Sequence, residues 1–98
     1  MLHVLRLAYT GSAEEAEPHV REHVDYLERH HASGAFLVSG QTAPPSDGGV
    51  IIARGDRAAV EEITGQDPFV RAGVGAYSVT TLDPGRVHPA LAGLLDAG

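Results

Sequence analysis

Apolar residues change their spacing along the chain, and these changes predict where strands and helices lie. Residues 2–9 form an apolar run rich in strand formers, which the turn residues at 10–12 interrupt, so we expect a first strand there. Beyond it, apolar residues recur at helical spacing as far as Gly34, which is placed to end a helix. The members of this stripe are Ala16, Val20, Val24 and Leu27.

The start of this helix carries two opposing signals. Ser12 and Glu15 have the spacing of a capping box, in which two residues satisfy each other's backbone N–H groups. Pro18 interrupts a helix that begins at Ala13, because proline has no N–H to donate. We therefore expect either a kink or a loose first turn, with the main helix beginning near Pro18.

Two apolar runs, at residues 35–39 and 49–54, follow the helix and predict a hairpin with a long loop over the turn-rich stretch 40–48. Asp56 is placed to cap a second helix that ends at Gly65. One side of this helix is apolar, with Ala59, Val60 and Ile63.

A last strand over residues 74–82 completes the order β-α-β-β-α-β. This order predicts an α+β domain of the ferredoxin-like, split β-α-β type, with two helices on one face of an antiparallel sheet. We assign residues 1–82 to this domain. Residues 83–98 are expected to form a C-terminal tail, in which Pro89 opens a short helix that packs against a neighbour.

Both faces of the predicted sheet are apolar. We expect Phe36 and Val38 on one face and Leu37 on the other, and positions 50–53 of the next strand are also apolar throughout. Two short helices cover one face only, and a soluble monomer rarely exposes such a patch. A homodimer is therefore expected.

Composition narrows the classes of function. The 98 residues, 43% of them hydrophobic, suit one domain with a small core. Thirteen acidic residues against seven basic ones give a net charge of −6, which argues against binding to nucleic acid phosphates. No apolar run reaches the roughly 18 residues of a membrane span, and we predict neither a signal peptide nor a transmembrane helix. The lack of cysteine suits a cytoplasmic protein.

Two short segments offer groups for proton chemistry. Arg21-Glu22-His23 places an imidazole at the edge of the apolar face of the first helix, and Asp67-Pro68-Phe69 supplies a carboxylate far downstream. A histidine can exchange a proton near neutral pH, and a carboxylate would orient it. In a purely structural interpretation, His23 is a hydrogen-bonded residue at the core edge, and Asp67 caps a short turn that closes at Gly73.

Metal and cofactor motifs lack support. His19 to His23 matches H-x-x-E-H, an inverted zinc-protease pattern, but the candidates for a third ligand, such as Glu61 or Glu62, have no supporting shell. No glycine-rich nucleotide fingerprint occurs. We predict no metal and no cofactor, and we expect His31 and His88 on the surface.

The residues resemble the YCII-related proteins, small ferredoxin-like domains. The likeness covers roughly residues 1–82, and the Asp-Pro-Phe element is its most distinctive part. The segments that carry it are Arg21-Glu22-His23, Tyr26-Leu27, Ser39-Gly40, Gly48-Gly49 and Asp67-Pro68-Phe69 before Gly73. The chain departs from the family at Gln41, where proline is frequent, and in its tail over residues 83–98.

The resemblance implies a dimeric α+β barrel with a cleft beside the dimer interface, where His23 and Asp67 form a catalytic or binding pair. Most members have no assigned reaction, and a few relatives act in the breakdown of chlorinated aromatic compounds.

Four further residues are candidates for binding a small molecule in such a cleft, and each has a structural alternative. Arg21 could bind an anion, or pair with Glu17 or Glu28. Tyr26 could present its hydroxyl, or pack its ring in the core. The other two are Ser39, which could instead contact backbone at a strand end, and Phe69, in the Asp-Pro-Phe element.

Two hypotheses of function follow. The first is a small enzyme without a cofactor, in which His23 moves a proton and Asp67 orients it, on a small polar or aromatic substrate; lyase, isomerase and dehalogenase reactions all suit this equipment. The alternative is a non-catalytic module that binds a small ligand or serves assembly. The sequence does not distinguish them, because both use the same side chains.

Overall fold

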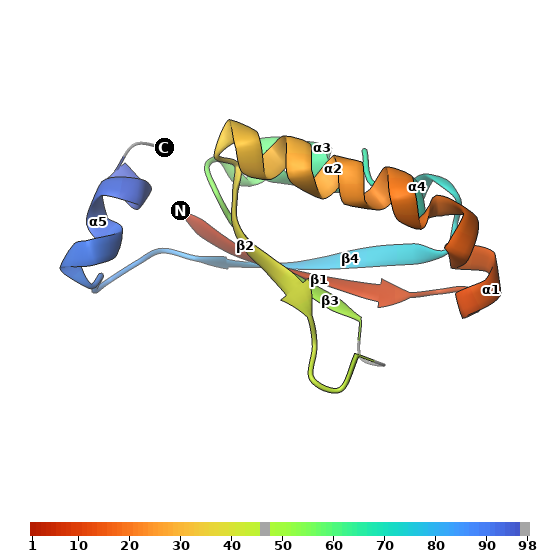
Figure 1. Ribbon diagram of the computed structural model, residues 1–98. Coiled ribbons are helices and arrows are strands. Elements are labelled where there is room, and N and C mark those ends of the chain that lie inside the picture. Colours follow the sequence, from red (N-terminus) through yellow and green to blue (C-terminus); the bar gives the residue numbers. More distant parts are fainter. Residues whose placement is uncertain (46–47, 97–98) are drawn as a thin grey trace.

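The computed structural model describes residues 1–45 and 48–96 of the chain (Figure 1). Residues 46–47 of the predicted long loop and residues 97–98 of the predicted tail lie outside the described residues.

Four strands form one antiparallel sheet in the order β2-β3-β1-β4. They are Leu2–Tyr9 (β1), Phe36–Gln41 (β2), Gly49–Arg54 (β3) and Gly75–Leu82 (β4). Strand β3 lies between β1 and β2, and β1 lies between β3 and β4, so each β-α-β unit is split by a strand of the other. The predicted α+β class with an antiparallel sheet is confirmed.

The helices lie mainly on one side of this sheet. The described residues contain Ala13–Ala16 (α1), the 3₁₀ turn Glu17–His19 (η1), Val20–Ser33 (α2), Arg57–Thr64 (α3), Pro68–Arg71 (α4) and Pro89–Asp96 (α5). Figure 1 shows α2, α3 and α4 over the same face, with the opposite face uncovered by any described helix. The short elements α1, η1, α4 and α5 are additions to the predicted β-α-β-β-α-β order.

The first helix begins as its sequence predicts. The N–H of Glu15 donates to Ser12 Oγ at 3.1 Å, and the N–H of Ser12 donates to Glu15 Oε1 at 2.9 Å, which completes the capping box. Pro18 then sits in the turn η1, and the long helix starts at Val20. The expected loose first turn is therefore present. Gly34 ends the helix with a φ of 86°, a left-handed conformation that glycine adopts without strain.

Asp56 does not cap α3 in the way predicted. It occupies the N-cap position, but its side chain makes no capping hydrogen bond. The N–H of Val60 donates instead to the backbone carbonyl of Asp56 at 3.0 Å, so the first turn is closed by the main chain.

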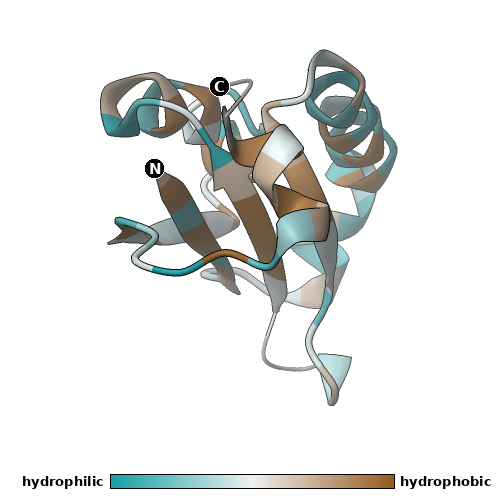
Figure 2. Cartoon of the chain, turned by 90° about the vertical axis from the view of Figure 1, so that its left-hand side faces the viewer, coloured by the Kyte–Doolittle hydropathy of each residue, from teal (hydrophilic) through white to brown (hydrophobic). Residues whose placement is uncertain are grey.

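The core lies between the sheet and the helices. Its main cluster consists of Leu5, Tyr26, Phe36, Ile51, Ala53 and Val60. A second cluster, Leu7, Ala16, Phe69 and Val74, packs at the end of the sheet beside α4. Tyr77 packs against both clusters. Along α2, hydrophilic and hydrophobic segments alternate (Figure 2), as expected of a helix that buries one face.

A β-bulge corrects one prediction about the sheet. Phe36 is paired with Ala53, whereas Val38 is paired with Ile52, so Leu37 is an extra residue in β2. Directly opposed residues share a face, and the extra residue reverses the alternation after it. Phe36 is therefore in the core, while Val38 is on the open face and 62% exposed. The expectation that these two side chains share a face is wrong.

The open face carries an apolar row across three strands, formed by Val38, Ile52 and Val4, which are neighbours in register.

Beyond β4, helix α5 begins at Pro89, as predicted, and Leu91 and Leu94 on it are about half exposed. The guanidinium of Arg54 donates to the carbonyl of Leu94. No helix within the described ranges has both the length and the hydropathy to cross a bilayer.

Candidate functional site

His23 and Asp67 lie in direct contact, although they are far apart in the sequence. Nδ1 of His23, on α2, is 2.8 Å from Oδ1 of Asp67, which precedes α4. Asp67 is fully buried, and the side chain of His23 is 13% exposed. An ionised carboxylate only accepts hydrogen bonds, so Nδ1 carries the proton and donates it. In the neutral ring, Nε2 then keeps its lone pair and is free to act as a base.

The same carboxylate caps a helix. Asp67 Oδ1 also accepts from the N–H of Phe69 at 2.9 Å, and Oδ2 accepts from the hydroxyl of Tyr77 at 2.5 Å. The first of these bonds makes Asp67 the N-cap of α4. The two interpretations of Asp67, as the partner of His23 and as a helix cap, therefore hold together.

The Asp-Pro-Phe sequence accounts for the local structure. Pro68 stands at the first position of α4, where its missing N–H has no helical partner to lose. Gly73, with a φ of 74°, closes the turn as predicted, and the N–H of Val74 donates back to the carbonyl of Phe69 at 2.9 Å. The ring of Phe69 is thereby held against the imidazole of His23, with centroids 4.2 Å apart and planes 13° from parallel.

A cavity of about 330 Å³, here called the cleft, opens between α2 and the sheet. Helix α2 supplies an apolar wall of Val20, Val24 and Leu27. His23 and Phe69 line it from one side, and Ser39 and Gln41 of β2 add polar groups from another. His23 therefore lines a mostly apolar cavity with a few polar groups, which is typical of sites for small molecules.

Three of the predicted site residues, His23, Ser39 and Phe69, line this cleft. Asp67 does not line it but is bonded to His23. The Oγ of Ser39 is 2.7 Å from Nε2 of His31. His31 is half-buried and its ring meets the edge of Phe36, so the expectation that it is a surface residue is wrong.

Two predicted binding residues do not reach the cleft. Tyr26 is fully buried in the core, and its hydroxyl donates to the carbonyl of Ile63 at 3.1 Å. Arg21 is exposed on α2 and lines neither the cleft nor the groove described below. Among the described residues it forms no ion pair, so the expected pairing with Glu17 or Glu28 is absent.

Sequence reasoning missed Tyr9 and Tyr77. Tyr9 lines the cleft, and its ring meets Phe69 edge-on at 5.9 Å. Tyr77 shares the inner face of its strand with Val79, and that alternation was the available signal that its side chain points inward. Burial raises the pKa of the Tyr77 hydroxyl well above its ordinary value, and the neighbouring Tyr26 adds to the rise. The Tyr77 hydroxyl thus keeps its proton more firmly than an exposed tyrosine and donates it to Asp67.

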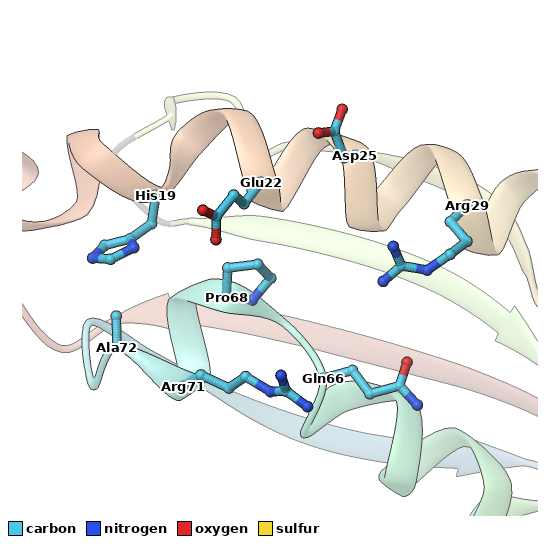
Figure 3. Close-up of a pocket in the computed structure, with 8 residues that line it drawn as sticks. All are labelled: His19, Glu22, Asp25, Arg29, Gln66, Pro68, Arg71 and Ala72. Carbon is cyan, nitrogen blue, oxygen red and sulfur yellow. The ribbon is translucent and has the colours of Figure 1, made fainter.

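A larger groove of about 500 Å³ lies on the outer side, between α2 and α4 (Figure 3). It is lined by His19, Glu22, Asp25, Arg29, Gln66, Pro68, Arg71 and Ala72. Charges of both signs surround it, and His23 does not line it. Although this groove is larger, we take the cleft as the candidate site, because His23, which is bonded to Asp67, lines the cleft and not the groove.

The zinc-protease pattern does not assemble a metal site in the described part of the chain. His19 lines the outer groove and His23 the cleft, so the two histidines diverge. Nδ1 of His23 is already bonded to Asp67. Across residues 1–45 and 48–96, no three potential ligands from His, Cys, Asp and Glu gather into a group that could hold a metal ion.

Two comparisons with known proteins gave matches. A family model described as the YCII-related domain matches residues 1–83. Among solved structures, the chain is similar to 5-chloro-2-hydroxyhydroquinone dehydrochlorinase from Burkholderia phenoliruptrix AC1100, in complex with 2,5-dihydroxybenzoquinone. The identity is 25% and the TM-score 0.69, over 87% of this chain and 96% of that one. No curated protein matches the sequence.

Replacing Asp67 is expected to weaken the fold as well as the site. Asp67→Asn removes the charge and one acceptor from a buried group that receives three donors. We expect the free energy of unfolding to fall by about 1.5–3 kcal/mol, the usual loss for hydrogen bonds to a charged group. Denaturant unfolding measures it, with the exposed Asp25→Asn as a control that changes stability by less than about 0.5 kcal/mol. Equal stability of both variants would contradict this.

His30 is expected to make stability fall in mild acid. Burial against Tyr26 and Phe36 lowers the pKa of His30 below its ordinary value of 6.5, although the bond to Gln66 opposes this. Below about pH 6.5 the unfolded chain therefore binds the proton more readily than the folded one, and unfolding is favoured as the pH drops. Unfolding measured between about pH 7.5 and pH 5.5 should show a smaller loss in His30→Gln. The exposed His88→Gln should keep the wild-type slope, and identical slopes in all three proteins would rule out this role.

Proposed function

The chain belongs to the family of YCII-related domains, and we propose that it is a small enzyme without a cofactor, in which His23 transfers a proton to or from a small aromatic molecule. One observation carries the proposal. The imidazole is held by a buried carboxylate at 2.8 Å while its ring lines a cavity of about 330 Å³. Proton transfer requires at least a base whose tautomer is fixed and a cavity beside it that binds the small molecule.

The roles of the pair follow from its hydrogen bond. Nδ1–H is committed to Asp67, so Nε2 is the atom that accepts a proton from the substrate. The carboxylate then stabilises the imidazolium that forms, because the opposite charges are close and shielded from water. Loss of HCl from a chlorinated hydroxylated ring suits this arrangement. A proton from one ring hydroxyl is delivered to the carbon that bears chlorine, which forms a keto tautomer. A second hydroxyl proton then goes to Nε2 as the C–Cl bond breaks and its electron pair leaves on chloride. The product is a hydroxylated quinone, and no external oxidant is needed because the hydroquinone is oxidised as the chlorinated carbon is reduced.

The walls of the cleft favour a flat ring as substrate. Aliphatic side chains of α2 and the rings of Tyr9 and Phe69 offer apolar contact, and aromatic rings prefer stacked or edge-on neighbours. Ser39 and Gln41 supply a small number of polar partners, as a hydroxylated ring requires. The similar dehydrochlorinase, solved with a dihydroxybenzoquinone, supports this class of ligand.

A non-catalytic binding module is the second candidate, and one observation favours it. Asp67 has a structural reason to be present, because it caps α4 whether or not His23 moves a proton. In that case the cleft binds its ligand and releases it unchanged.

Replacing His23 is expected to abolish turnover. With 5-chloro-2-hydroxyhydroquinone as the first substrate of a panel of halogenated hydroquinones, chloride release measures the reaction. His23→Gln should lower kcat/KM by at least about 100-fold, the usual contribution of a general base. His19→Gln, on the same helix but in the outer groove, should retain wild-type activity. Ligand binding without chloride release in the wild type, or full activity in His23→Gln, would favour the binding module.

We further propose a homodimer that covers the open face of the sheet. The row of Val38, Ile52 and Val4 crosses three strands, none of the described helices lies over it (Figure 1), and Val38 is 62% exposed. Leu82, on the same face, is 51% exposed. Burying such a row against its symmetry mate removes apolar surface from water on both chains.

Light scattering at micromolar concentration is expected to give twice the mass of one chain. Val38→Asp should lower this mass to that of a monomer, because the dimer would bury two unpaired carboxylates. Val87→Asp makes the same change at an exposed position away from the sheet and should leave the dimer intact. A wild-type protein with the mass of a single chain would refute the homodimer.

A further inference from the structure

We propose that Tyr77 is a positioning residue of the site, whose hydroxyl fixes the Asp67 carboxylate in the orientation that presents Oδ1 to His23. This inference rests on the proposed role of His23 as the base. It adds a third member, on β4, to a pair supplied by α2 and the loop before α4.

The geometry distributes the donors over both carboxylate oxygens. The hydroxyl of Tyr77 donates to Oδ2 at 2.5 Å, a length typical of a hydroxyl bonded to a charged carboxylate. Oδ1 accepts from the Phe69 N–H at 2.9 Å and from Nδ1 of His23 at 2.8 Å. The carboxylate is therefore anchored from the sheet through one oxygen and from the α4 turn through the other, and rotation about its last bond would break both contacts.

Removing the Tyr77 hydroxyl has a specific consequence. Oδ2 would be left without a partner in a fully buried residue, and such an atom carries a large desolvation cost. The carboxylate can relieve the cost by turning away from the imidazole toward other donors or by taking up a proton. In either case it becomes a weaker acceptor for Nδ1–H of His23, and the imidazole loses its preference for that tautomer.

Tyr26 supplies a matched comparison. It is a second buried tyrosine close to the pair, with its ring 6.0 Å from that of His23. Its hydroxyl donates to the carbonyl of Ile63 and not to Asp67. Tyr26→Phe and Tyr77→Phe thus delete the same atom from neighbouring positions in the core, and only the second deletion removes a donor from the carboxylate.

The experiment records the ring nitrogens of His23 by long-range ¹H–¹⁵N spectra of histidine-labelled protein near neutral pH, without any substrate. We expect the wild type and Tyr26→Phe to show the tautomer with the proton on Nδ1. In Tyr77→Phe we expect this pattern to be lost, with the Nε2 signal moved toward the position of a protonated nitrogen. An unchanged His23 spectrum in Tyr77→Phe, or an equal change in both variants, would overturn the inference.

Asp67→Asn serves as the reference in the same spectra. If it alters the His23 tautomer while Tyr77→Phe does not, Tyr77 is only a packing residue and the proposed role of His23 stands. If neither variant alters it, the coupling of His23 to Asp67 fails, and the proposed function fails with it. Should Tyr77→Phe not fold, the wild type itself provides the test. A slowly exchanging Tyr77 hydroxyl proton, with a nuclear Overhauser effect to the Nδ1–H of His23, supports the inference, and its absence contradicts it.

Discussion

A buried negative charge on Asp67 is the constraint to which the rest of this structure is fitted. The residue is fully buried, and its oxygens accept from His23 on α2, from Phe69 on its own turn and from Tyr77 on β4. A carboxylate in such a position is costly unless donors replace the water it has lost. Because each donor comes from a different element, the helix, the turn and the sheet must come together for the charge to be satisfied.

The cleft is a result of how α2 meets the sheet. The buried side of the helix divides into two parts, since Tyr26 fills the core while Val20 and Val24 border the cavity. His23 lies between these parts, at the edge of the packed interior. Water is thus limited around the imidazole without being removed, and an electrostatic contact there is stronger than it would be at an open surface.

Local patterns predicted most of the secondary structure, because caps, periodicity and turn residues act over a few positions. The capping box at Ser12, the loose turn at Pro18 and the stop at Gly34 all follow from such short-range physics. The bulge in β2 did not, because it is defined only by pairing with β3. For the site, a contact between residues 44 apart leaves no trace in local spacing. The pairing of His23 with Asp67 rests on the chemistry of the two groups and on a family resemblance. Tyr77 was missed because its partner depends on where α4 docks against β4.

The capping role of Asp67 also affects how the protein could evolve. Selection for a folded chain alone would preserve the aspartate, because its loss leaves the N–H of Phe69 in α4 and the hydroxyl of Tyr77 without their acceptor. A descendant that gave up the proposed reaction would therefore keep the carboxylate long after His23 had been replaced by another residue. Such a lineage retains the carboxylate of the proposed site for structural reasons alone, and a single substitution to histidine could restore the pair. In a set of relatives, the histidine, and not the aspartate, would then mark those that still perform the proposed chemistry.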